Sequence, residues 1–65
     1  MPRFPELVFK ADAARVQCKN KIDRLREAGA DEQTMARARK GWGLGSRALV
    51  EGRLADAVAA FESVT

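Results

Sequence analysis

Cys18 is the most nucleophilic side chain in this 65-residue sequence, and it is the only cysteine. A thiol attacks a substrate once a neighbouring base has removed its proton, and the usual base is histidine. The sequence contains no histidine. Cys18 lies on an apolar helical pattern, which predicts a core residue. We therefore expect no catalytic role for it.

Metal binding and acid–base catalysis also lack the residues they need. A zinc site takes several thiolates or imidazoles, which one cysteine cannot supply. The nine carboxylates are scattered among basic residues, so no pair is placed for proton transfer. A domain of this length has little room for an enclosed pocket. The sequence predicts a protein that is not an enzyme, with no catalytic residue, no metal and no cofactor.

Residues 40–46 read K-G-W-G-L-G-S, which raises the question of a phosphate-binding loop. Such a loop follows a strand and reads G-x-x-x-x-G-K-[ST], whereas this lysine precedes the glycines. The even glycine spacing also fails the dinucleotide pattern G-x-G-x-x-G. A break between two helices is one interpretation, because glycine is unfavourable inside a helix. Close packing of another helix against the glycines is the interpretation we favour.

Helices are the elements that would position these residues, since apolar residues recur at spacings of three and four. Pro5 suits a helical first turn, and Gly29 and Gly52 suit left-handed C-terminal caps. Asp31 can cap the helix that follows it. A connection this short makes the first two helices antiparallel neighbours. We predict one all-α domain over residues 1–65, with two longer antiparallel helices and a short C-terminal helix, at about 5–28, 31–51 and 54–64.

The run L-G-S-R-A-L-V-E-G-R-L-A-D-A-V-A-A-F, within residues 38–65, resembles the helix pair of a single tetratricopeptide repeat. That repeat carries L-G, a turn glycine and A-x-x-x-F. The resemblance implies that Gly45 lies where the two helices approach most closely, opposite Ala57 or Phe61. It departs from the family at Ala48, where an aromatic residue is usual, and it leaves Gly41 and Gly43 unexplained.

Basic residues give the chain a net charge of +3, and the excess lies mainly in the first 30 residues. A candidate basic face around the first two helices comprises Lys21, Arg24, Arg37 and Lys40. Such a face can contact phosphates. The turn A-G-A-D-E-Q is similar to that of the Rop family, RNA-binding proteins that form dimeric four-helix bundles. A dimeric hairpin that binds RNA or DNA is therefore an alternative function, beside an acidic protein partner and a plainly solvated surface.

The length of the chain favours association with another protein. A chain of this size hides only about 60% of its unfolded surface, and disulfides and metals are excluded as supports. We expect a non-enzymatic interaction module, an adaptor, inhibitor or accessory subunit, that forms a homodimer or joins a complex. Large apolar side chains would dominate its interface. The candidates are Phe4, Leu7, Val8, Phe9 and Trp42.

The sequence has no apolar run of the roughly 20 residues that a membrane-spanning helix needs. Its N-terminus also lacks the pattern of a secretory signal. A single cysteine fits a reducing compartment. We therefore expect a cytoplasmic protein without a membrane partner.

Overall fold

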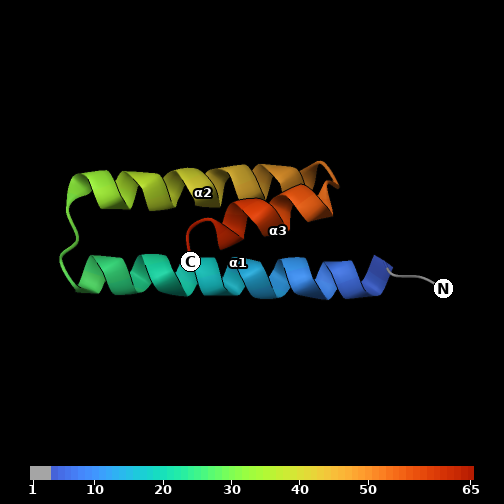
Figure 1. The fold of residues 1–65 in the computed structure, drawn as a ribbon, viewed down its shortest axis with the longest axis horizontal. Helices are drawn as coiled ribbons and strands as arrows, with labels where there is room; N and C mark the ends of the chain where they lie inside the picture. Colours follow the sequence, from blue (N-terminus) through green and yellow to red (C-terminus); the bar gives the residue numbers. More distant parts are fainter. Residues whose placement is uncertain (1–3) are drawn as a thin grey trace.

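A computed structural model of the chain describes the backbone of residues 4–65 and the side chains of residues 6–65. It contains the helices α1 (Phe4–Glu27), α2 (Glu32–Val50) and α3 (Leu54–Glu62). No strand occurs in residues 4–65. α2 runs antiparallel to α1, and α3 turns back to lie along both (Figure 1). The prediction of an all-α fold with two longer antiparallel helices and a short third helix is confirmed.

Glycine ends α1 and α2 in the same way. Gly29 and Gly52 have φ angles of +76° and +80°, a left-handed backbone that costs glycine little. The residue after each glycine donates its N–H to the carbonyl five residues earlier, at 2.9 Å from Ala30 and 2.8 Å from Arg53. These bonds satisfy carbonyls that would otherwise be unpaired at the helix end. Both turns are therefore specified by local sequence.

The start of α2 is held by a side-chain cap. Asp31 Oδ1 accepts a hydrogen bond from the Thr34 N–H at 2.9 Å. This bond satisfies one of the free amides at the helix N-terminus, as expected for an aspartate in this position. Hydrogen bonds from the side chain and backbone of Thr34, helped by the charge of Arg37, lower the pKa of Asp31.

α3 ends at Glu62, whereas the apolar pattern predicts a helix that reaches residue 64. Beyond Glu62 the backbone N–H groups of Val64 and Thr65 donate to carbonyls only three residues earlier, both at 3.2 Å. The Ser63 hydroxyl also donates to the Ala60 carbonyl at 2.6 Å. Side-chain bonds of this kind compete with helical backbone bonds and favour helix ends. The last three residues therefore form a tight turn.

The three helices approach closely because their shared core is built mainly from small residues. Phe61 of α3 and Cys18 of α1 are its largest fully buried side chains. The Trp42 ring packs against Phe61 with 5.5 Å between ring centroids and a 57° tilt. The remaining buried apolar residues are Ala11, Ala14, Ile22, Met35, Ala38, Ala48, Ala57 and Val58.

α2 is one uninterrupted helix through K-G-W-G-L-G-S, so the helix-break interpretation does not hold. A Cβ atom on Gly45 would lie 2.6 Å from two atoms of the Phe61 ring. Real Cβ atoms do not approach neighbours so closely, so Gly45 makes room for Phe61. Gly41 makes room in the same way for the Val64 side chain, whereas Gly43 faces open space.

Candidate protein interface

α1 carries apolar residues on two opposite faces. Its inner face packs into the core through Ala11, Ala14, Cys18 and Ile22. On the opposite face Phe9, Ala13 and Val16 follow one another at spacings of four and three, which aligns them along the helix. We call these three residues the outer stripe. Charged and polar residues occupy the two flanks of α1 between these faces.

The outer stripe is exposed to solvent. The Phe9 side chain is 74% exposed and Val16 is 43% exposed, and Ala13 is also exposed. In its N-terminal half, α1 thus presents Phe9 and Val16 to water, whereas the small residues Ala11 and Ala14 face the core. The inner residues are small because α3 brings Phe61 close to α1. No helix within residues 4–65 packs over the outer stripe as α3 packs over the inner face.

Charges beside the outer stripe are balanced. Asp12 and Arg15 form an ion pair at 2.9 Å, and both remain partly exposed. Glu6 and Lys10, which carry opposite charges, flank the outer stripe on the side away from Asp12 and Arg15. Exposed pairs such as Asp12 with Arg15 contribute little to stability. The charges beside the outer stripe therefore give this surface no net charge of either sign.

The structure separates the residues that the sequence grouped into one interface. Phe9 lies on the outer stripe, and Val8 beside it is 45% exposed, while Leu7 is half-buried. The side chain of Phe4 lies outside the described residues. Trp42 belongs to a different helix, where it is half-buried against Phe61. The structure does not bring it together with residues 7–9, because it faces the core from α2.

Several exposed apolar residues lie outside the interface predicted from the sequence. Val16 is not among the interface residues predicted from the sequence, although its seven-residue distance from Phe9 indicates that the two share a helix face. Val50, at the end of α2, is 87% exposed, and Leu44 is 54% exposed. Neither has an apolar neighbour three or four residues away that is equally exposed, so no stripe connects them.

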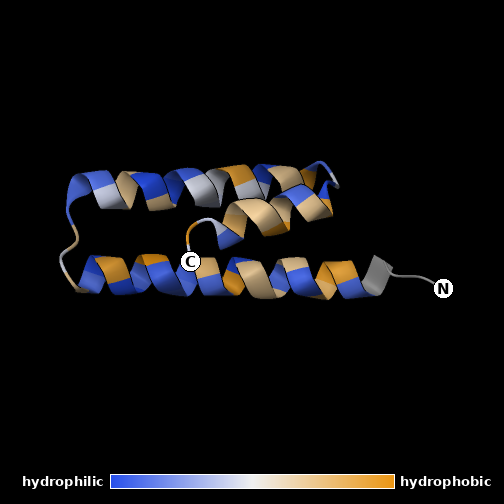
Figure 2. Ribbon diagram, viewed as in Figure 1, coloured by the Kyte–Doolittle hydropathy of each residue, from blue (hydrophilic) through white to orange (hydrophobic). Residues whose placement is uncertain are grey.

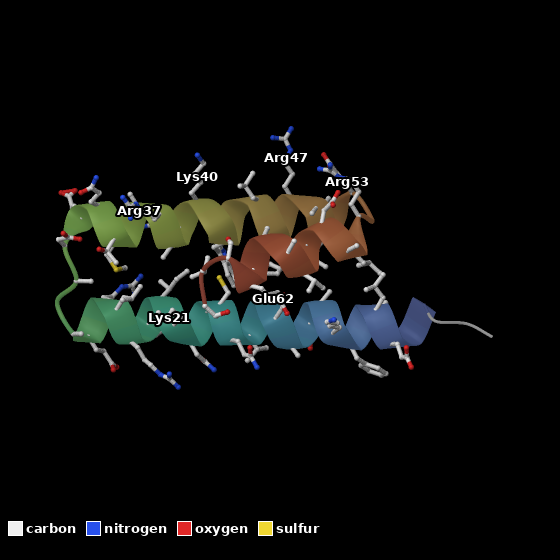
Figure 3. The ribbon with its side chains drawn as sticks, in the orientation of Figure 1. Lys21, Arg37, Lys40, Arg47, Arg53 and Glu62 are labelled. Atoms are coloured by element: carbon white, nitrogen blue, oxygen red, sulfur yellow. The ribbon has the colours of Figure 1, made fainter. Side chains whose placement is uncertain are left out.

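The structure brings together three of the four candidate basic residues and leaves Lys40 apart. Lys21 of α1 and Arg37 of α2 line the same cavity, and Lys21 and Arg24 line a second one beside it. Lys40 points away from the other helices (Figure 3). The ion pairs within residues 6–65 use Arg15, Arg47 and Arg53, so none of these four cations takes part in one.

The buried position of Cys18 disfavours nucleophilic attack by its thiol. The side chain is fully buried, and burial raises the pKa of its thiol, which keeps the nucleophilic thiolate scarce. In residues 4–65 no group of three or more side chains is placed to hold a metal ion. No helix in that range combines the length and the apolar character needed to cross a membrane.

Residue hydropathy differs along the helices. Apolar residues appear along much of α1 and on both sides of its N-terminal half, whereas the half of α2 near the α1–α2 turn is mainly hydrophilic (Figure 2). Comparison of the chain with known protein families, with curated proteins and with solved structures finds no match.

Proposed function

We propose that this protein is a small non-enzymatic interaction module that binds another protein through the outer stripe of α1. The observation that carries the proposal is the 74% exposure of Phe9 on a helix whose opposite face is already packed. Phe9, Ala13 and Val16 have the i, i+4, i+7 spacing with which amphipathic helices enter apolar grooves. An adaptor, an inhibitor and an accessory subunit would each use such a helix.

The energy available from this surface is modest. Burying a side chain of the size of phenylalanine or valine contributes about 1.5–3 kcal/mol. A specific interface usually buries roughly 800 Å² on each partner, more than two helical turns provide. The contact would therefore extend around α1 to Val8, which is 45% exposed beside Phe9, and to polar residues that flank the outer stripe.

A second copy of the chain is one partner that this surface could bind. Two outer stripes packed together would bury the Phe9 side chains of both copies and form a homodimer. Sedimentation equilibrium of the purified protein distinguishes a self-associating chain from one that binds a different protein. A cytoplasmic partner accords with the free thiol of Cys18.

Substitution of Phe9 tests the proposal, with Val50 as the matched control. Phe9→Ser removes the largest exposed side chain of the outer stripe, and Val50→Ser removes an even more exposed one elsewhere. Both variants should keep the helicity and melting temperature of the parent, because neither side chain is in the core. We expect Phe9→Ser to lower affinity for the partner, or for a second copy, about tenfold or more, and Val50→Ser to leave it unchanged.

Two results would contradict this assignment. One is unchanged binding by Phe9→Ser. The other is an equal loss of binding in Val50→Ser, which would mean that exposed apolar residues contribute without regard to position.

A further inference from the structure

The groove between α1 and α2 is only partly filled by α3. α3 lies in this groove along the half of the molecule far from the α1–α2 turn, and it ends at Glu62 (Figure 1). α1 and α2 continue past that point toward their connecting turn. A cavity of about 310 Å³ occupies the groove there. It is lined by Lys21, Leu25, Thr34, Arg37, Ala38, Ser63 and Val64.

This open half of the groove, which we call the open groove, has an apolar floor and basic walls. Leu25, Ala38 and Val64 supply apolar surface from α1, α2 and the C-terminal turn. Lys21 stands on the α1 wall and Arg37 on the α2 wall. A second cavity of about 350 Å³ shares Lys21 and adds Arg24 on the α1 side.

The charged side chains that line the open groove are all basic. No aspartate or glutamate side chain lines either cavity. Lys21, Arg24 and Arg37 form no ion pair with side chains of residues 6–65. Arg37 does act on Asp31, whose pKa it helps to lower, but Asp31 belongs to the α2 cap and not to the cavity walls. The open groove is therefore complementary to an anionic occupant.

We propose that the open groove binds an acidic amphipathic helix of a partner protein. α3 shows what the groove accepts, since it fills the other half with a helix that is apolar on its inner face. An occupant that continues this arrangement needs an apolar stripe over Leu25 and Ala38. It needs carboxylates on both flanks of that stripe, because the cations stand on both walls.

A nucleic acid fits the open groove less well. Its phosphates would satisfy the cations but leave the apolar floor in contact with water. Single-stranded RNA and DNA are usually held by aromatic stacking, and no aromatic residue lines either cavity. Trp42 lines a different cavity, with Ile22 and Asp23 of α1. The apolar floor is what selects a helix over a nucleic acid.

The open groove is separate from the outer stripe, so the two proposals fail independently. The outer stripe lies on the exposed face of α1, opposite the face that packs into the core, whereas the groove lies between α1 and α2. A protein with both surfaces would bridge two partners. Phe9→Ser should leave occupancy of the groove unchanged, and substitutions in the groove should leave the outer stripe unchanged.

The test is a titration of the ¹⁵N-labelled protein with a synthetic helical peptide, followed by amide chemical shifts. The peptide has about 14 residues, or four turns, with leucine and alanine on one face and glutamate on both flanks. Its counterpart carries lysine at every glutamate position. Titration to about 1 mM detects even weak binding. A single-stranded RNA and inorganic phosphate serve as further probes.

We expect saturable shifts at Lys21, Leu25, Thr34, Arg37 and Ala38 with the glutamate peptide and none with the lysine peptide. The double variant Lys21→Glu/Arg37→Glu should weaken binding at least tenfold. The control Lys10→Glu/Lys40→Glu makes the same change in net charge outside the groove and should retain binding. Since the contact is partly ionic, affinity should also fall as salt increases.

Three outcomes would overturn the proposal. The first is the absence of saturable shifts at millimolar glutamate peptide. The second is an equal loss of binding in both double variants, which would indicate nonspecific attraction to net charge. The third is binding of RNA or phosphate at the groove residues without binding of the peptide, which would assign the site to phosphate ligands.

Discussion

Three glycines of α2 have three different environments, although the sequence presents them as one repeated pattern. Gly45 gives space to the fully buried ring of Phe61. Gly41 gives space to Val64, at the end of the chain, and Gly43 faces solvent. All three carry the same propensity cost in a helix interior, about 1 kcal/mol relative to alanine. Only the packing against α3 distinguishes them.

Alanine at positions 45 and 43 should therefore have opposite effects. In Gly45→Ala the new Cβ displaces the Phe61 ring, and overpacking of this kind costs about 1–3 kcal/mol, more than the gain in helix propensity. In Gly43→Ala the propensity gain of about 0.5–1 kcal/mol is unopposed. Urea unfolding followed by circular dichroism should show a lower midpoint for the first variant and a higher one for the second.

A smaller side chain at position 61 should relieve the steric clash that Gly45→Ala introduces. Phe61→Leu alone leaves a cavity and destabilises the core, but it also removes the ring atoms that the Cβ at position 45 would strike. The double variant should therefore be more stable than the sum of the two single effects predicts. Simple additivity in this double-mutant cycle would mean that the two positions are not in contact.

Contacts between particular residues are predictable from the sequence where helical spacing sets them, and are not where they depend on the path of the chain. The repeat resemblance placed Gly45 opposite Ala57 or Phe61, and the structure has Phe61 there. The role of Gly41 was not predictable, because it depends on how the turn after Glu62 positions Val64. The size of Trp42 favours an interface residue, but in the structure its side chain is half-buried against Phe61.

Helix boundaries are the features of this fold most readily obtained from the sequence, because their causes are local. Gly29 and Gly52 end helices through their own backbone freedom, and Asp31 caps the next helix through one hydrogen bond. The outward face of α1 was harder to predict. Its inner stripe of small residues explained the apolar pattern, so the second stripe through Val16 was overlooked.

The Asp31 cap should make the stability of the protein depend on pH in the acid range. Its pKa is lower in the folded state than in the unfolded state, so the ionised carboxylate stabilises the fold above its ordinary pKa. That stabilisation is lost as the pH falls through the ordinary value of about 3.9 and then through the folded value. Asp31→Asn keeps a capping side chain but does not titrate.

Thermal unfolding at neutral pH and in acid tests this linkage. The melting temperature of the parent should exceed that of Asp31→Asn at neutral pH, and the difference should vanish in strong acid. Asp31→Ala, which loses the cap as well, should melt lowest at neutral pH. A difference between parent and Asp31→Asn that persists unchanged into strong acid would show that ionisation of Asp31 does not contribute.

At the scale of the whole molecule, the elongated shape leaves much of α1 uncovered. The principal extents are 45 × 17 × 14 Å. α1 has 24 residues and is about 36 Å long, whereas α3 has 9 and spans about 14 Å. One short helix therefore covers only part of the groove between α1 and α2, and none of the outer face of α1. The open groove follows from this difference in length, whereas the outer face of α1 is uncovered because α2 and α3 both pack against its opposite face.

The central claim is that the outer stripe is buried by a partner in the cell. It is tested most directly by placing a photo-activated cross-linking analogue of phenylalanine at position 9 in cells that express the protein, with the same analogue at the exposed position 36 of α2 as control. We expect one predominant adduct at position 9, either with a second copy or with one other protein. It should be lost when Val16→Glu is added and be absent at position 36. The same adducts at both positions, or no adduct at position 9, would contradict the claim.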